Sequence, residues 1–594
     1  MPKITLNGKQ LNVKGGQTIL NVAFEQGIEI PTLCFLKEIN EIGFCRMCVV
    51  EVEGEKDLVS ACNTPIKKGM VIHTESQKVV ESRQSTLALL ANKHRFNCWV
   101  CPRGDGTCDF YNQLKDYSVD NFQFGPSEGR HDFVIPGEGI IQDQTKCILC
   151  KRCVAVCNNV VTAKVFKFRD ENPNDPIVSP TPGLPFADAG CIFCGQCTKA
   201  CPTGTLVETD HIERVERAIR DPKKHVIVQI APATRTAIGE PFGYPIGTPV
   251  REVEGKMYHA LKMLGFDEVT DTNYAADLTI MEEGTEFIER ITSKLNGEET
   301  VLPLFTSCSP GWVRYIEQYR PEYMANLSTA KSPHMMQGAV LKNFYAVNEL
   351  KKDPKEVYVV SIMPCTAKKY EIERPEMEND GIRDVDAVLT TRELARLIKK
   401  NNIDFVNLED YQPENRFAKY TGAATIFGAS GGVMEAAIRT VYALLEGKEL
   451  DNIDLQQVRG VHSEHQIKEA TIKVAGIDVN VAIVHGGAGI KKMFEILDEG
   501  KKEYHFIEFM GCPGGCVNGG GQPIVKEEYR DKFDVAAARA KALYESDAQD
   551  TEYRRSHLND AVKWTYDNWF EKPGSHAAHK YLHTNYSQKN YRKE

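Results

Sequence analysis

Residues 147–157 read CILCKRCVAVC, and residues 191–202 read CIFCGQCTKACP. Both runs have the cysteine spacing C-x2-C-x2-C-x3-C, and the second begins 44 residues after the first, so the pair forms an internal repeat. This close spacing lets one turning loop bind three corners of an iron–sulfur cube, while the fourth cysteine can reach a neighbouring cube. The repeat therefore predicts two adjacent [4Fe–4S] clusters, and structural thiols or zinc sites are the less specific interpretation.

The predicted cubes exchange ligands across the repeat. In bacterial ferredoxins that hold two clusters, each run gives three ligands to one cube and its last cysteine to the other. The expected ligands are Cys147, Cys150, Cys153 and Cys201 for one cube, and Cys157, Cys191, Cys194 and Cys197 for the other. Residues 126–210 are therefore predicted to form a bacterial 2[4Fe–4S] ferredoxin-like module.

This module lies in a chain of 594 residues with 19 cysteines, of which fifteen lie in the first 201 residues. We expect small metal-bound modules at the N-terminus and one large globular domain after them. The net charge of −10 argues against a nucleic-acid binder. The N-terminus shows no export signal, and no apolar run is long enough to span a membrane. A cytoplasmic protein follows, and in that reducing compartment clustered cysteines are more often metal ligands than disulfides.

The N-terminal residues 1–78 are predicted to form a β-grasp module of the plant-ferredoxin type. Two short strands are expected over 3–13, joined at Asn7-Gly8, because Asn-Gly is the preferred pair for a type I′ turn. A helix is expected over 18–26. Four thiolates in this setting suit a [2Fe–2S] cluster better than a zinc knuckle, whose first cysteine gap is usually shorter. These thiolates belong to Cys34, Cys45, Cys48 and Cys62.

Residues 79–125 carry a cysteine set that lacks one member. Cys98, Cys101 and Cys108 follow a helix expected over 77–95, and His94 lies four residues before the first of them. A lone histidine at a helix end is usually a cap or a surface residue. Here three unpartnered cysteines favour His94 as the fourth ligand of a third accessory [4Fe–4S] cluster. A neutral imidazole in place of a thiolate should raise the potential of that cluster.

From about residue 211 the sequence alternates between strand and helix patterns. Buried strands are expected over 225–232, 356–365 and 479–486, and helices near 286–295, 338–350, 391–400 and 432–446. The alternation predicts an α/β domain with parallel strands over 211–571, and hence a mixed α/β, multidomain protein. The remaining residues, 572–594, form a basic, His-rich stretch that we interpret as a solvated or docking tail.

The last four cysteines occur in three segments, FTSCSPGW (305–312), MPCTAKKYE (363–371) and EFMGCPGGCVNGGGQP (508–523). These resemble the signature segments of the [FeFe], or iron-only, hydrogenases, and the N-terminal cysteine pattern resembles the accessory domains of the multi-cluster members. The resemblance covers nearly the whole chain. It implies reversible formation of H2 from protons and electrons at an H-cluster. That cofactor is a [4Fe–4S] cube joined through a cysteine to a two-iron site with CO, cyanide and azadithiolate ligands.

The resemblance also implies roles for single residues. Cys365, Cys512 and Cys516 match ligands of the cube, and Cys516 matches the cysteine that bridges to the two-iron site. Lys368 matches a lysine that holds a cyanide, and lysine is suited to this because it donates charge-assisted hydrogen bonds to anions. Glycines around the last two cysteines let the backbone approach a bulky cofactor. Met363 and Met510 match residues that pack around the dithiolate. Ala231 and Pro232 match a backbone segment that contacts the other cyanide.

The first segment departs from the family pattern, which has two adjacent cysteines before Pro-x-Trp. In the common form the first cysteine is the last proton donor and the second is a cube ligand. Here the pair is Cys308-Ser309. One alternative is that Ser309 ligates as an alkoxide and Cys308 transfers protons. The other is that the loop shifts and Cys308 becomes the ligand, which the usual preference of iron–sulfur clusters for thiolate favours.

A proton route to the cofactor needs titratable groups in series. Glu283 and Glu286 lie three residues apart and could share one face of a helix. A solvated acidic pair is the ordinary interpretation. The family resemblance implies that both glutamates are relay members, together with Ser328, and Arg290 could anchor the outer carboxylate.

Two hypotheses concern the electron partner. The chain could act with ferredoxin alone, or it could be the catalytic subunit of an NAD(P)-linked hydrogenase, including the electron-bifurcating kind. The His-rich tail and the Cys-Ser pair are similar to the second group. No nucleotide fingerprint occurs in the chain, so NAD(P) chemistry would require a flavin-containing partner. A non-hydrogenase electron-transfer or assembly protein of the same fold is the alternative, but the chain keeps Lys368 and both methionines.

Overall fold

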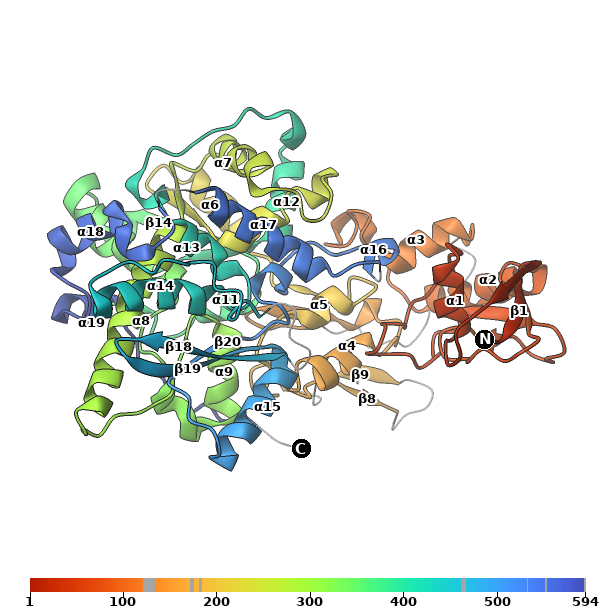
Figure 1. Ribbon diagram of the computed structural model, residues 1–594. Helices are drawn as coiled ribbons and strands as arrows, with labels where there is room; N and C mark the ends of the chain where they lie inside the picture. Colours follow the sequence, from red (N-terminus) through yellow and green to blue (C-terminus); the bar gives the residue numbers. More distant parts are fainter. Residues whose placement is uncertain are drawn as a thin grey trace.

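The computed structural model describes residues 1–120, 134–170, 176–180, 184–460, 466–530, 532–550 and 553–591. Figure 1 shows small N-terminal modules extending from a larger body that contains most of the helices and strands. The segment around α4 (Arg152–Ala155) and α5 (Gln196–Ala200) lies between these two parts. The predicted mixed α/β multidomain class is confirmed.

The N-terminal module is a five-stranded sheet of order β2 (Lys9–Asn12), β1 (Lys3–Leu6), β5 (Val71–His73), β3 (Val49–Val52) and β4 (Val59–Ser60). Asn7 and Gly8 both have positive φ, 47° and 81°, which confirms the predicted hairpin turn. Helix α1 (Ile19–Glu25) begins after Thr18, whose side chain accepts from the Asn21 backbone N–H. Buried aliphatic side chains of the sheet and α1 form the core of this module.

The next modules are short helices joined by cysteine loops. Helix α2 (Gln77–Asn92) ends three residues before the predicted end, and the 3-10 turn η1 (Cys98–Val100) and helix α3 (Asp109–Asp116) follow. Part of the predicted linker, 121–133, lies outside the described residues. The repeat is visible in the backbone, because Leu149 and Lys151 have positive φ, as do Phe193 and Gly195 44 residues later.

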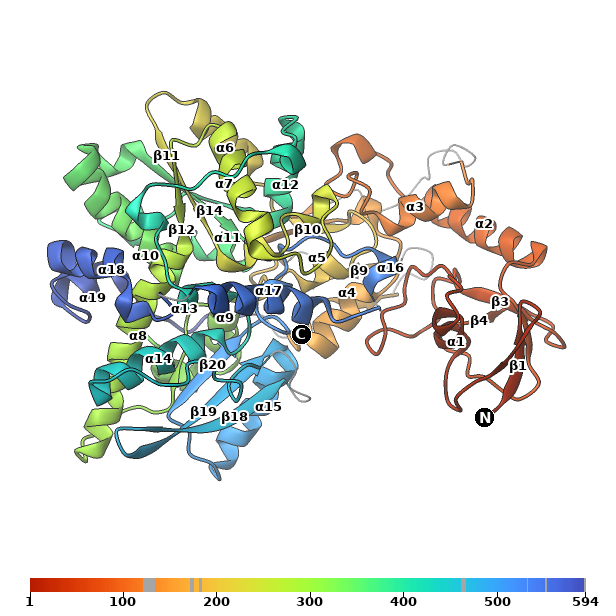
Figure 2. The same cartoon turned by 45° about the horizontal axis from the view of Figure 1, so that its top comes forward.

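Two sheets form the framework of the large body. One has the order β12 (Glu268–Asp271), β11 (His225–Ile230), β14 (Val357–Met363) and β17 (Ala387–Thr390), and all its pairs are parallel. The other has the order β13 (Leu304–Phe305), β20 (Phe506–Met510), β19 (Ile477–His485) and β18 (Ile467–Val474), and only β18 is antiparallel. Figure 2 shows the sheets apart, with α8 (Thr272–Leu295) and α9 (Pro310–Tyr319) between them.

The predicted helices of this body are present, but two differ in extent. Helices α12 (Thr391–Lys400) and α14 (Gly432–Glu446) match their predictions. The helix expected near 286–295 is the last part of α8, whose first turns are buried all round and so lack an amphipathic period. The one expected over 338–350 is α10 (Pro333–Val340) continued by the π-helical segment η8 (Leu341–Leu350).

The C-terminal tail is docked on the catalytic body. Helix α19 (His576–Leu582) is capped by Ser575, and Leu582 is fully buried. The Lys331 N–H donates to the Leu582 carbonyl over 2.8 Å, and the Thr584 N–H donates to Thr329 over 2.8 Å. Of the two interpretations of the tail, docking is therefore the one observed for its described part.

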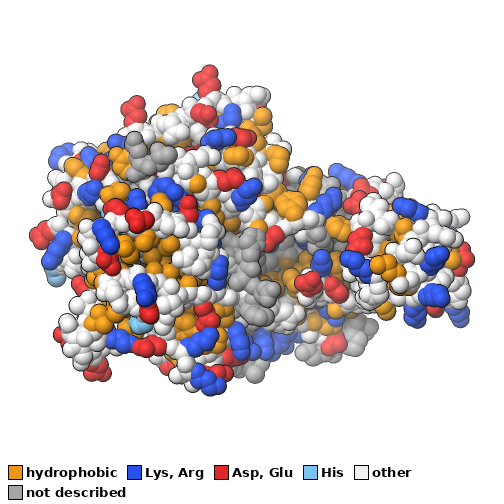
Figure 3. All heavy atoms as spheres, viewed as in Figure 1, with side chains coloured by type: hydrophobic (Ala, Val, Ile, Leu, Met, Phe, Trp, Pro, Cys, Tyr) orange, Lys and Arg blue, Asp and Glu red, His pale blue; other side chains and the backbone are white. Residues whose placement is uncertain are grey.

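Charged side chains of both signs are interspersed over the face shown in Figure 3. Among the helices of the described residues, none combines the length and hydropathy needed to cross a lipid bilayer.

Candidate active site

A cavity opens where strands of both sheets end. Residues after the carboxyl ends of β11, β14, β13 and β20 line it, and crossing points of this kind are where α/β folds commonly bind ligands. The structure thus brings together every residue that was predicted around the cofactor. These are Ala231, Pro232, Cys308, Ser309, Met363, Cys365, Lys368, Met510, Cys512 and Cys516.

Three thiols of this cavity suit a metal cluster. Cys365 follows β14, Cys512 follows β20, and Cys516 begins the 3-10 turn η13 (Cys516–Asn518). Burial raises the pKa of Cys365 and of Cys516 to about 12, so neither would ionise at neutral pH without a bound cation. Gly515 (φ 96°) shapes the loop, because a Cβ there would lie 2.7 Å from the Ser430 nitrogen. The donor set therefore fits an iron–sulfur cluster.

Lys368 is held at the wall of the cavity by two partners. Its Nζ donates to the Glu371 carboxylate over 2.8 Å and to the Cys308 carbonyl over 3.1 Å. Burial opposes the charge of Glu371, but Lys368 and His334 outweigh it and lower the pKa of this carboxyl to about 2. His334 lies 2.6 Å from Glu371, and burial lowers the pKa of this imidazole to about 4. The ammonium group is thus preorganised, and no motif in the sequence pointed to His334.

Cys308 and Ser309 both line the cavity, but their side chains have different neighbours. Burial raises the pKa of the Cys308 thiol, and the charges of Glu283 and then of Cys516 raise this pKa further. The Ser309 hydroxyl accepts from the Gly511 N–H over 3.3 Å, beside Cys512. Cys308 packs against a hydrophobic cluster that includes Ala276 and Ile280 of α8, as does Cys516. The Ser309 hydroxyl lies at the cysteine loop that follows β20.

The predicted proton relay lies along α8. Glu283 is 1% exposed, and burial together with the charge of Glu286 raises its pKa to about 8. Ser328 donates to Glu286 Oε2 over 2.8 Å, and Arg290 donates to Glu286 Oε1 over 2.6 Å. Of the five predicted residues, Ser328 and Arg290 thus hold Glu286, while both carboxylate oxygens of the buried Glu283 lack a hydrogen-bond partner among the residues that the structure describes.

A buried network from the tail borders this relay, and the sequence did not reveal it. Glu282 accepts from the Tyr566 hydroxyl over 2.6 Å and lies 3.0 Å from His583 Nε2. His583 Nδ1 lies 2.7 Å from the Thr329 hydroxyl, while the Thr329 N–H donates to Glu286 over 3.1 Å. The His-rich composition of the tail was the only available signal.

The predicted His94 site is also assembled. A second cavity of about 360 Å³ is lined by His94, Cys98, Cys101 and Cys108. His94 Nδ1 lies 3.1 Å from the Lys146 carbonyl. A hydrogen bond from one ring nitrogen to a carbonyl is typical of a metal-ligating imidazole, which binds the metal through the other nitrogen.

The thiols of the repeat fall into two groups. Burial raises the pKa of both Cys153 and Cys197. The thiols that raise the pKa of Cys153 further are Cys150, Cys147, Cys201 and then Cys197, and those that raise the pKa of Cys197 are Cys191, Cys157 and then Cys201. In each copy a backbone N–H approaches a ligand sulfur, from Leu149 to Cys147 at 3.4 Å and from Phe193 to Cys191 at 3.3 Å. The assignment of ligands to each cube stays a prediction.

The second group reaches the large cavity directly. Cys194 and Cys512 are close enough for one thiolate to raise the pKa of the other. A Cβ on Gly520 would lie 2.2 Å from the Cys194 carbonyl oxygen, so only glycine permits this approach. At the other end of the chain, Cys34 lies beside Cys45 and Cys48 beside Cys62, in one N-terminal loop region.

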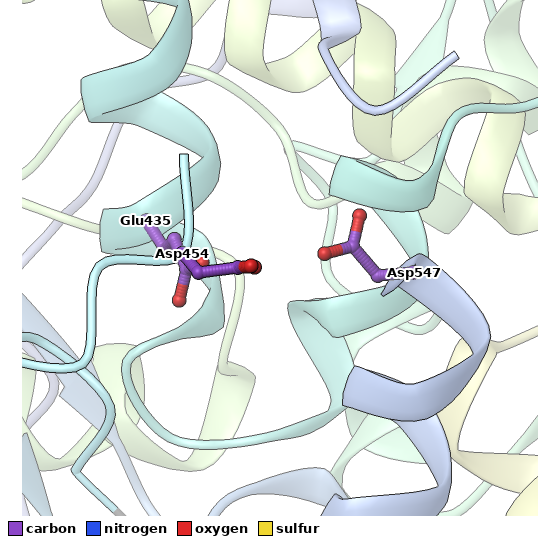
Figure 4. Close-up of side chains that lie close together, drawn as sticks. All are labelled: Glu435, Asp454 and Asp547. Carbon is purple, nitrogen blue, oxygen red and sulfur yellow. The ribbon is translucent and has the colours of Figure 1, made fainter. Parts of the chain in front are cut away.

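One acidic cluster in the described residues has the proximity of a metal site but is neutralised by arginines. Figure 4 shows Glu435 and Asp454 facing Asp547. Arg439 binds Glu435 and Asp547 at 2.7 and 2.9 Å, and Arg554 binds Asp547 and Asp454 at 2.7 Å each. We interpret this cluster as a structural ion-pair network.

The fold and the cavity define an iron–sulfur oxidoreductase whose thiol-lined active site continues into a series of cluster sites. Four family profiles match the chain. They describe the C-terminal domain of the iron-only hydrogenase large subunit (224–520), a 2Fe-2S cluster binding domain (2–77), a 4Fe-4S dicluster domain (146–205) and the iron hydrogenase small subunit (533–589). The chain belongs to the iron-only hydrogenases.

Similar proteins agree with this assignment. The chain is 43% identical to iron hydrogenase 1 of Clostridium pasteurianum, covering 99% of this chain and 100% of that one. It is 42% identical to the NADP-reducing hydrogenase subunit HndD of Solidesulfovibrio fructosivorans, covering 99% of each. The solved structure of a variant of apo [FeFe]-hydrogenase HydA1 from Chlamydomonas reinhardtii has a TM-score of 0.56 at 35% identity, covering 64% of this chain and 100% of that one. The chain is thus a hydrogenase that binds iron–sulfur clusters and an H-cluster.

Proposed function

We propose that this hydrogenase interconverts protons, electrons and H2 in the large cavity, and that the other cysteine groups carry its electrons. The observation that supports this most strongly is the direct packing of the second cysteine run against the loops of the thiol-lined cavity. Thr366 donates to the Phe193 carbonyl over 2.6 Å, and Gln196 donates to the Asn518 carbonyl over 2.9 Å. When bound, the H-cluster supplies the redox chemistry of H2, while the protein supplies orientation, ligands and charge.

The proposed accessory clusters number four. One [2Fe–2S] cluster is held by the N-terminal cysteines, one [4Fe–4S] cluster by His94 and its three cysteines, and two by the repeat. Their sites follow one another from the N-terminal module to the catalytic body (Figure 1). Metal analysis tests this count, since the four accessory clusters and the six-iron H-cluster together contain about 20 irons per chain.

Residues of the cavity wall have distinct proposed roles. Lys368 donates its N–H groups to an anionic cyanide ligand, and Glu371 keeps that ammonium group in place. Met363 and Met510 provide soft, adaptable packing around the dithiolate. Ala231 and Pro232 present backbone to the other cyanide. Cys365, Cys512 and Cys516 would hold the cube, and Cys516 would also bind the two-iron site.

For the fourth corner of the cube we propose Ser309, with Cys308 kept for proton transfer. The Ser309 hydroxyl accepts from the Gly511 N–H beside Cys512, whereas Cys308 packs against residues of α8, the helix that carries Glu283. Ligand softness still favours a thiolate, so the choice depends on whether side-chain placement outweighs the preference for sulfur.

The proposed proton route runs between solvent and the cavity through Glu286, Ser328, Glu283 and Cys308, and Arg290 anchors Glu286 at its outer end. Glu286 is fixed by an ion pair and a hydroxyl donor, so it can pass a proton to Ser328 without losing its position. Glu283 is mostly protonated near neutral pH and can serve as a donor to the Cys308 sulfur.

We further propose that the electron partner is ferredoxin, a flavin-containing NAD(P)-linked subunit, or both. The similarity to HndD, the subunit of an NADP-reducing hydrogenase, supports the second partner. Trp99 and Val100 are 85% and 67% exposed beside Cys98, which is unusual for such apolar side chains and suits a contact surface. Purification from native lysate distinguishes the cases, because a chain that purifies alone and turns over with reduced ferredoxin needs no flavin subunit.

Infrared spectroscopy of anaerobically matured protein tests the central proposal. Bound CO and cyanide are expected to give bands in a region where protein does not absorb. The matched control is Lys368→Met, which is expected to weaken or shift the cyanide bands. Mature protein with full iron content but without such bands would refute the hydrogenase function.

A further inference from the structure

Arg103 is buried between two proposed cluster sites and keeps unused hydrogen-bond donors. Only 4% of the residue is exposed, and it lines the cavity formed by His94, Cys98, Cys101 and Cys108. Its Nη2 donates to the Cys201 carbonyl over 2.9 Å. Its Nε and Nη1 have no hydrogen-bond partner in the structure.

Such an arrangement is costly unless something accepts those hydrogens. A guanidinium cannot lose its charge in proteins, so burial cannot be relieved by deprotonation. Buried donors are nearly always paired, and an orphaned one points to a missing acceptor. A Cβ added to Gly204 would lie 2.4 Å from Cys101 Sγ and 3.8 Å from Arg103 Cγ, so the Arg103 side chain lies near a proposed ligand sulfur.

We propose that Arg103 tunes the cluster bound by His94, Cys98, Cys101 and Cys108 by donating N–H groups from Nε and Nη1 to its sulfur atoms. Hydrogen bonds to sulfur and nearby positive charge both stabilise the reduced cluster and raise its potential. The inference rests on the proposed function of this cavity as a cluster site.

The hydrogen bond that Arg103 makes through Nη2 connects this cluster site to the next one in the electron path. Cys201 is a proposed ligand of the neighbouring cube, and its carbonyl accepts from the same guanidinium. The loop after Cys201 closes on the cavity, since a Cβ on Gly204 would lie 2.4 Å from Cys101 Sγ. One side chain therefore touches the cavity of one cluster and the backbone of a ligand of the next.

The test is an EPR-monitored redox titration of the holoenzyme with Arg103→Gln, Arg103→Lys and the control Lys115→Gln. Lys115 is an exposed cation on α3 whose field also reaches Cys98, so its removal measures charge loss alone. Arg103→Gln is expected to lower the potential of the histidine-ligated cluster by at least the equivalent of a tenfold change in its reduced-to-oxidised ratio, about 59 mV for one electron. The potential of Arg103→Lys should lie between those of the parent protein and Arg103→Gln, and Lys115→Gln should lower the potential much less than Arg103→Gln does.

A direct readout accompanies the titration. In protein labelled with 15N-arginine, pulsed EPR of the reduced cluster should show a 15N coupling that Arg103→Lys abolishes. A shift in Arg103→Gln no larger than in Lys115→Gln, or no such coupling in the parent protein, overturns the inference. Loss of this cluster alone in both Arg103 variants also overturns it, because Arg103 would then be a scaffold residue. Absence of a histidine-coupled cluster in the parent protein would instead refute the proposed cofactor.

Discussion

Replacing Glu283 by glutamine tests the proton relay at its most buried member. Burial and the charge of Glu286 raise the pKa of Glu283 to about 8. At pH 7 roughly nine in ten of these carboxyls then carry a proton, and at pH 9 roughly one in ten does. H2 evolution needs the protonated form, so its rate should fall as pH rises through about 8. H2 uptake needs the ionised form and should rise over the same range.

The amide in Glu283→Gln cannot titrate, so the change in rate near pH 8 should disappear. Turnover should slow by about 10²–10⁴-fold, which is the usual contribution of a positioned acid to the rate. The assay is H2 evolution from a reduced viologen dye with anaerobically matured protein, followed between about pH 6 and 9.5. Glu289→Gln, an exposed carboxylate on the same helix, is the control and should behave like the parent protein. Infrared spectra must show an intact cofactor in both variants. A pH limb that survives in Glu283→Gln, or a loss of less than about tenfold, would refute this role.

Three further predictions concern the surroundings of the site. Lys368→Met leaves Glu371 as a buried carboxylate without its lysine partner and removes a hydrogen-bond donor from the cavity. Activity should therefore fall by about 10²–10³-fold, and the infrared bands of cyanide should change. Cyanide bands like those of the parent protein would contradict this role. His583→Ala removes the hydrogen bond between the tail and Thr329, the residue after Ser328. The rate of H2 evolution should fall about tenfold while the infrared bands stay unchanged. An unchanged rate would show that docking of the tail does not position the relay. Arg439→Met removes a positive charge from the acidic cluster of Figure 4 and should lower the free energy of unfolding by about 3–5 kcal/mol. The thermal midpoint should be lower than that of Lys492→Met, a control at an exposed site. Equal midpoints would contradict the structural role.

The sequence predicted the modules well because metal ligands are constrained by spacing. Loops that bind three corners of a cube need cysteines at fixed short intervals, and the repeat shows the same positive-φ positions in both copies. The Asn7-Gly8 turn was predictable for a similar reason, since few residue pairs accept its backbone angles. The ends of α8 were less predictable, because its first turns are buried on every side and carry no periodic pattern.

Contacts between distant segments could not be predicted in this way. In the sequence, Glu282 is one of several charges in an acidic stretch. Only the structure shows that His583 of the tail lies against it. Arg103 likewise reads as an ordinary loop arginine, and only the fold buries it between two cluster sites. Spacing along the chain constrains local loops, whereas such pairings depend on the packing of whole domains.

The choice between Cys308 and Ser309 combines both kinds of information and gives the last prediction. If Ser309 completes the cube, Ser309→Ala should lose or destabilise that cube, while Cys308→Ala should keep it and lose proton transfer. Iron content and EPR of the catalytic cube distinguish these outcomes without relying on turnover. The reverse result, with the cube lost in Cys308→Ala and intact in Ser309→Ala, would assign the ligand to Cys308.

Ser309→Cys adds a second test of the ligand, in which a misfolded variant could not give the expected result. An alkoxide concentrates negative charge on a hard oxygen and favours the oxidised cube, whereas a thiolate spreads that charge over a softer atom. The substitution should therefore raise the potential of the catalytic cube if residue 309 is a ligand. It should leave the potential unchanged if Cys308 already occupies the corner, because the new thiol would then lie outside the coordination shell. The placement of the Ser309 hydroxyl beside Gly511 favours the first result, since the chain folds a side chain toward the cube there whatever atom that side chain carries.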